Sequence, residues 1–164
     1  MEGELFMKEI FGAITKQLSK LGRAMLIPIA ATPVAGLLAR LSAPDMLNLP
    51  VLESASWVVF GMLDMLFAIG AVVAYTKVKD KTCPILGSII SLAVFKQTLA
   101  FMNPDISMGV FAGIVVGVFT AIIYNYSREW KTPDMFSFFT GDKFVVTLAP
   151  IAAVPFGIIF SYIW

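Results

Sequence analysis

Five long apolar stretches run through the chain, and they constrain its fold more than any other feature. They are residues 21–41, 55–76, 84–102, 108–126 and 144–164. Each has roughly 20 residues, and a helix of that length, rising ~1.5 Å per residue, crosses a hydrocarbon layer about 30 Å thick. Hydrophobic residues make up 59% of the chain and charged residues 14%, which is too much apolar surface for a soluble core. The sequence therefore predicts an all-α membrane helix bundle with about five transmembrane helices.

The basic residues gather on alternate connections between these stretches. Of the 12 Lys and Arg residues, ten precede or open the first stretch, follow the second or follow the fourth: Lys8, Lys16, Lys20, Arg23, Lys77, Lys79, Lys81, Arg128, Lys131 and Lys143. Connections that are rich in Lys and Arg remain in the cytoplasm, so we expect a cytoplasmic N-terminus and Trp164 on the opposite side. The formal net charge is only +1, and we expect no nucleic-acid partner.

The residues before the first apolar stretch form a segment of their own, 1–20. Apolar side chains recur here at three- and four-residue spacing: Phe6, Ile10, Ile14, Leu18 and Leu21. This period predicts an amphipathic helix in the cytoplasmic membrane interface, and a plain cytoplasmic extension of the first span is the alternative. Within that span, Pro28 and Pro33 each remove a backbone donor, which predicts a kink or local unwinding.

Two charged residues fall inside predicted spans, Asp64 in the second and Lys96 in the third. A charge at that depth costs about 3 kcal/mol, so each should face protein or water and find a partner. Asp64 lies 12 residues before Thr76 and Lys96 lies 12 residues after Pro84, which places both ~18 Å from the cytoplasmic ends of their helices. The sequence therefore predicts an intramembrane ion pair, with Lys96 in a polar pathway as the alternative.

The fourth span carries a glycine every four residues, at Gly109, Gly113 and Gly117. Small residues at this spacing let a second helix approach closely, which is how membrane helices pack. The stripe predicts a helix-packing face, either within the chain or between subunits, although glycines in a membrane helix can also have no specific role.

The sequence predicts no catalytic, cofactor or metal site. It has no histidine, and its one cysteine, Cys83, can form neither an intrachain disulfide nor a zinc site. The connection from 127 to 143 is unusual in carrying Phe136, Phe138 and Phe139, which we expect in the headgroup layer or inserted into the bundle.

Residues 133–145, PDMFSFFTGDKFV, resemble the Pro-Glu-x-x-x-Phe-Phe-x-Gly-Lys-Arg-Phe-Val stretch of one family. This family is the enzyme IIC membrane components of the phosphoenolpyruvate-dependent sugar phosphotransferase system, in its glucose/maltose/N-acetylglucosamine branch. Residues 20–30, 33–38, 66–70 and 109–114 resemble further stretches of the family in the same order, so the likeness runs from about 18 to 164. The chain departs from the family pattern at Asp64, Met65, Asp142 and Val146.

The resemblance implies a membrane component of sugar uptake coupled to phosphorylation, in a bacterial inner membrane. Residues 21–164 correspond to the family's N-terminal scaffold and dimer-forming half, and the sugar-holding residues lie in the later half. We therefore expect a shortened component that is inactive alone. Its expected partners are lipid, a second copy, a permease or the missing transport half, and a cytoplasmic phosphocarrier domain in the complete system. The alternatives are a small non-catalytic protein that modulates a full-length permease through the glycine stripe, and a small channel or lysis-type protein.

Overall fold

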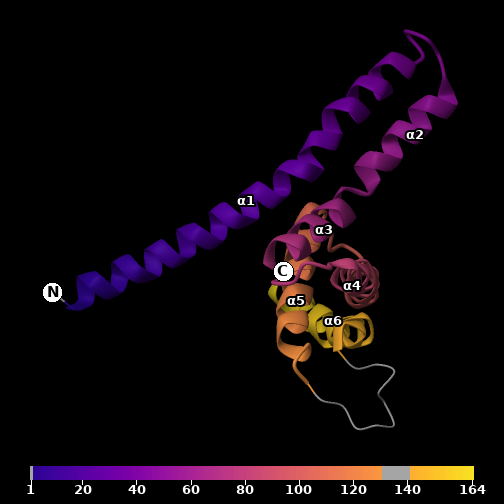
Figure 1. The fold of residues 1–164 in the computed structure, drawn as a ribbon. Coiled ribbons are helices and arrows are strands. Elements are labelled where there is room, and N and C mark those ends of the chain that lie inside the picture. The colour runs from indigo at the N-terminus through magenta and orange to yellow at the C-terminus, as the bar shows by residue number, and fades with distance from the viewer. Residues whose placement is uncertain (1, 131–140) are drawn as a thin grey trace.

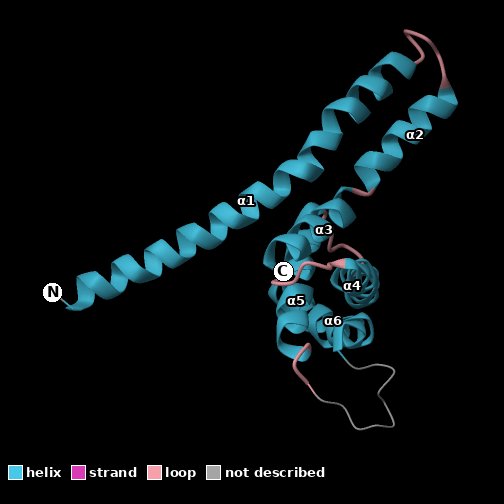
Figure 2. Ribbon diagram, in the orientation of Figure 1, coloured by secondary structure: helices cyan, strands magenta, loops and turns pink. Residues whose placement is uncertain are grey.

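The fold is all-α, as a computed structural model describes it for residues 2–130 and 141–164 (Figures 1 and 2). The helices are α1 (Glu2–Ser42), α2 (Pro50–Gly61), α3 (Leu63–Tyr75), α4 (Thr82–Met102), α5 (Val110–Ser127), the short 3-10 turn η2 (Gly141–Lys143) and α6 (Phe144–Ile163). The expectation for Phe136, Phe138 and Phe139 lies outside the described residues.

Helices α3 to α6 form a bundle, and α1 and α2 extend from it as a long hairpin (Figure 1). Within the bundle, α3 packs most extensively on α5, and α4 packs most extensively on α6. α1 contacts the bundle chiefly through α3. The predicted spans therefore correspond to α1, α2 with α3, α4, α5 and α6, and the predicted all-α bundle with about five membrane-length helical units is confirmed.

The predicted second span is broken in two. α2 and α3 meet at Met62 and are bent by 42° to each other, although together they are long and apolar enough to cross a membrane. The apolar run in the sequence is continuous, so composition predicted one uninterrupted helix. Gly61 and Asp64 flank the break, and both disfavour a helix interior, since glycine is flexible and the Asp side chain competes for backbone donors.

Helix α1 remains continuous past both of its prolines and bends along its length (Figure 1). Pro33 cannot donate to the carbonyl of Ile29, and the Thr32 hydroxyl donates to that oxygen instead, at 2.8 Å. Pro28 likewise cannot donate to the carbonyl of Ala24. That carbonyl oxygen lies 3.0 Å from the place a Cβ would occupy at Gly70 of α3, so neighbouring groups cover both freed carbonyls.

The bundle core is aromatic where α4, α5 and α6 meet. Phe95 of α4 is fully buried and contacts Phe156 and Phe160 of α6, with ring centroids 5.7 and 5.8 Å apart. Phe156 also stacks on Phe119 of α5 at 4.2 Å and 7°. This cluster fixes α4 against α6 and therefore sets where the polar residues of α4 face.

Polar contacts join the helix ends on the side of the bundle that carries most of the basic residues. The Asn125 side chain of α5 accepts from the Lys77 backbone N–H and donates to the Tyr75 carbonyl. Tyr75 in turn donates its hydroxyl to the Gln17 carbonyl of α1 at 2.9 Å. These contacts place residue 17 of α1 level with the end of α3, and no break in α1 separates the predicted segment 1–20 from the rest of the helix.

Candidate functional site at the helix break

Asp64 lies in the first turn of α3, immediately after the break at Met62. The first N–H groups of a helix have no partner within it, and a carboxylate there also interacts favourably with the helix dipole. The Asp64 carboxylate meets this need, because its Oδ1 accepts from the Met65 backbone N–H at 2.8 Å. The charged residue of the predicted second span therefore lies at the break, where the N–H groups of the new helix need a hydrogen-bond acceptor.

The structure brings Asp64 and Lys96 together. The Lys96 Nζ lies 2.5 Å from Asp64 Oδ2, so the two carboxylate oxygens have separate partners. The two side chains differ in exposure: that of Asp64 is 9% exposed and that of Lys96 is 54% exposed. The carboxylate is thus enclosed by the bundle, while the ammonium reaches it from the edge.

A pocket of about 410 Å³ opens beside this ion pair, between α3 and α4. Asp64, Lys96 and Gln97 provide its polar lining, and the other lining residues are Met65, Ile89, Leu92, Ala93 and Ala100. The pocket can hold a polar group near the pair, although most of its wall is apolar.

Two of the three stripe glycines make the close packing of α3 on α5 possible. A Cβ at Gly113 would lie 1.9 Å from the Asp64 carbonyl oxygen, and one at Gly117 would lie 2.4 Å from the Ala68 carbonyl oxygen. Gly109 is different: it precedes α5 with a φ of +50°, and a Cβ there would meet nothing within 4 Å. Gly113 and Gly117 therefore pack against α3 of the same chain.

Asp64 is the point at which the sequence-predicted residues meet. Its carboxylate contacts Lys96 and its own helix terminus, and its carbonyl lies against Gly113. Cys83 lies apart, in the first turn of α4, where it packs near Tyr124 and Val145. Sequence reasoning missed the helix break and the pocket, and the only signal for the break was Gly61 close before Asp64 within an apolar run.

Helices long and apolar enough to cross a membrane, with a charge pair between two of them, are typical of a polytopic membrane protein. Residues 22–164 match the model of the family described as Phosphotransferase system, EIIC. The chain belongs to this family, and the resemblance seen in its sequence is confirmed.

Curated relatives carry more specific names. The chain is 36% identical over 145 residues to the "PTS system N-acetylglucosamine-specific EIICBA component" of Escherichia coli (strain K12), which covers 88% of this chain and 22% of that protein. It is 33% identical to the "PTS system glucosamine-specific EIICBA component" of Bacillus subtilis (strain 168), over 90% of this chain and 25% of that protein. The "PTS system N-acetylglucosamine-specific EIIC component" of Streptomyces coelicolor is 26% identical, and the match covers 90% of this chain and 41% of that protein.

The chain thus spans about a quarter of the length of the first two of these relatives. The family match over most of the chain favours a permease component over a small modulator of a permease. The positions of Gly113 and Gly117 agree with this, because the stripe on which the modulator hypothesis depended packs inside the chain.

Replacing Gly113 with alanine should destabilise the bundle. The added methyl collides with the backbone of α3, which cannot move away as a side chain could, and overpacking of this kind costs about 1–3 kcal/mol. Gly22→Ala is the matched control, because a Cβ at that helical position meets nothing within 4 Å. The free energy of unfolding, measured by SDS titration in mixed micelles, should fall for the first variant only. Equal stability of both variants would show that α3 and α5 are not in backbone contact at Gly113.

A double-mutant cycle tests the ion pair. Asp64→Asn and Lys96→Gln should each destabilise the protein, and their coupling energy should be about 1 kcal/mol or more, as for residues in direct contact. Gln97 lines the same pocket, and the control substitution Gln97→Ala should show almost no coupling to Asp64→Asn. Exchanging the two charges should restore only part of the loss, because a lysine at position 64 cannot accept from the Met65 N–H. Additive single-site effects would disprove the pairing.

Proposed function

We propose that this chain supplies the membrane-embedded scaffold part of a sugar-specific phosphotransferase permease in a bacterial inner membrane, with its N-terminus in the cytoplasm. The family match over residues 22–164 is the observation that carries the proposal. The bundle of α3 to α6 supports a scaffold role, because the charged side chains within these helices pair with each other: Asp64 binds Lys96 and the start of its own helix.

An amino sugar of the N-acetylglucosamine class is the proposed substrate of the complete permease. The support comes from the names of the relatives, which specify N-acetylglucosamine in Escherichia coli and glucosamine in Bacillus subtilis. The cytoplasmic phosphoryl carriers are further proposed partners, because those same names join the EIIC component to B and A components.

The proposal also includes association with further membrane-embedded protein, either a second copy or the transport half of the permease. Lys96 supports this, because its side chain is 54% exposed at a depth where an uncovered charge is costly. Large apolar side chains on α1 and α2 are exposed as well, among them Leu37, Val51 and Trp57, and these can contact lipid or protein. Asp64 pairs with the Lys96 ammonium, but more than half of the lysine side chain is left for further protein to cover.

A chimera tests the proposed function. The 145-residue segment of the Escherichia coli relative that aligns with this chain is replaced by the matching residues of this chain, in cells that lack their own N-acetylglucosamine permease. The chimera should restore phosphoenolpyruvate-dependent uptake of labelled N-acetylglucosamine, because the segment supplies scaffold and not sugar ligands.

The chain expressed by itself and the relative without the segment are the controls, and neither should support uptake. A chimera that inserts into the membrane at normal levels but transports no amino sugar would contradict the proposal. Uptake by the chain expressed by itself would contradict the scaffold role.

A further inference from the structure

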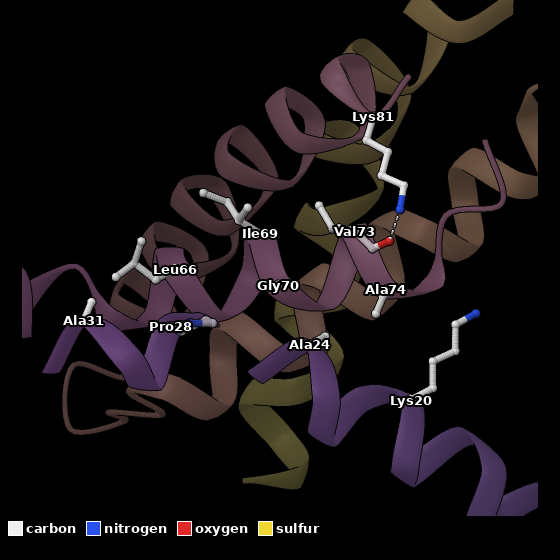
Figure 3. A pocket seen from close by; sticks show the side chains of 10 residues that line it. All are labelled: Lys20, Ala24, Pro28, Ala31, Leu66, Ile69, Gly70, Val73, Ala74 and Lys81. Carbon is white, nitrogen blue, oxygen red and sulfur yellow. Dashed lines mark hydrogen bonds between the residues drawn. The ribbon is translucent and has the colours of Figure 1, made fainter. Parts of the chain in front are cut away.

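A groove of about 530 Å³ lies between α1 and α3, on a different face of α3 from the ion pair. Its lining is apolar except at one end, and the residues are Lys20, Ala24, Pro28, Ala31, Leu66, Ile69, Gly70, Val73, Ala74 and Lys81 (Figure 3). None of these residues belongs to the site at the helix break.

The shape of the groove follows from the close approach of α1 and α3 at Gly70. The Ala24 carbonyl, freed by Pro28, lies where Gly70 has no side chain, so the two backbones meet there and form the floor. Small side chains at Ala31 and Ala74 leave the space above this floor open. The floor of the groove is therefore backbone, and its walls are mostly apolar side chains.

Both cations of the groove lie at the same end, near Val73 and Ala74, while Leu66 and Ala31 lie at the other (Figure 3). The Lys81 Nζ is held there, since it donates to the Val73 carbonyl at 2.7 Å. The Lys20 Nζ lies 5.3 Å from the centroid of the Tyr75 ring.

The acidic residue closest in sequence to this end is Asp80, and it has other partners. Its Oδ1 accepts from the backbone N–H and the hydroxyl of Thr82. These hydrogen bonds, the backbone one first, hold the pKa of Asp80 below its ordinary value. Asp80 thus hydrogen-bonds to Thr82 at the start of α4, and neither Lys20 nor Lys81 forms an ion pair with it.

We propose that this groove binds one anionic phospholipid of the cytoplasmic leaflet, with its phosphate between Lys20 and Lys81 and one acyl chain along Pro28, Ile69 and Leu66. Charge complementarity selects this occupant: an apolar slot with cations at one end only fits an amphiphile with an anionic head. Basic pockets between membrane helices on the cytoplasmic side bind anionic headgroups in this way. The inference rests on the orientation included in the proposed function, which places the Lys-rich end at the cytoplasmic surface.

Native mass spectrometry of the purified chain, residues 1–164, tests the site. The protein is released from phosphatidylcholine nanodiscs that contain added phosphatidylglycerol with identical acyl chains, and the bound lipids are counted. One phosphatidylglycerol should remain bound in preference to phosphatidylcholine. Lys20→Gln with Lys81→Gln should weaken its binding at least tenfold, because each lysine near the surface contributes about fivefold. Lys20→Arg with Lys81→Arg should retain it.

The matched control, Lys16→Gln with Lys79→Gln, removes the same charge from exposed positions outside the groove on the same helix and loop, and should bind as the parent does. A second pair of variants tests the apolar part: Ala31→Phe fills the groove, whereas Ala30→Phe faces away from it. Only the first should expel the lipid, with the helical content unchanged by circular dichroism.

Three results would overturn the inference: equal retention of the two lipids, equal loss in the control lysine pair, or displacement of the lipid by glycerol phosphate as effectively as by phosphatidylglycerol. The last would show a headgroup site without an acyl-chain groove. Lipid counting uses purified protein and the chimera assay uses sugar uptake in cells, so the two proposals fail separately.

Discussion

The rest of the structure depends on how backbone polar groups are satisfied where a helix breaks at membrane depth. Hydrocarbon provides no hydrogen-bond partner, so each donor or acceptor released by a break must find one inside the protein. At Met62 the second span stops and restarts, and Asp64 accepts from the first turn of the new helix through Oδ1. The same carboxylate then requires a cation, which Lys96 provides through the other oxygen. The charge pair is therefore a consequence of the break as well as a link between helices.

Close backbone approach follows from the same constraint. Gly113 allows α5 to lie against the Asp64 carbonyl, and Gly70 allows α3 to lie against the carbonyl that Pro28 frees in α1. Membrane helices gain little from burying apolar side chains, since lipid is equally apolar, and so they associate through close packing and polar contacts. Pro28 and Gly70 thus act together, because the proline releases a carbonyl and the glycine on the neighbouring helix leaves room for it.

The sequence predicted the parts of the fold that have a one-dimensional signal. Span length, the clustering of basic residues and the equal depths of Asp64 and Lys96 can all be counted along the chain. Membership of the EIIC family was also predicted from short motifs and is confirmed by the match to residues 22–164. The break at Met62 was not predicted, because Gly61 and Asp64, which flank it, lie within a run that is otherwise as apolar as an intact span. The groove between α1 and α3 depends on how two helices cross, and the partners of Gly113 and Gly117 depend on which helix lies opposite, so neither has a signal within one segment.

The central claim is that α2 and α3 form a single broken crossing, so that the described helices cross the membrane five times. A re-entrant α2–α3 pair would give four crossings. An odd number of crossings places the two ends of the chain on opposite sides of the membrane, and an even number places them on the same side. A reporter that is active only in the cytosol is therefore fused before residue 1 in one fusion protein and after Trp164 in another. Five crossings predict activity at the N-terminal fusion and none at the C-terminal one. Activity at both ends would show an even number of crossings, and the Asp64–Lys96 pair would then no longer lie within a continuous passage through the bilayer.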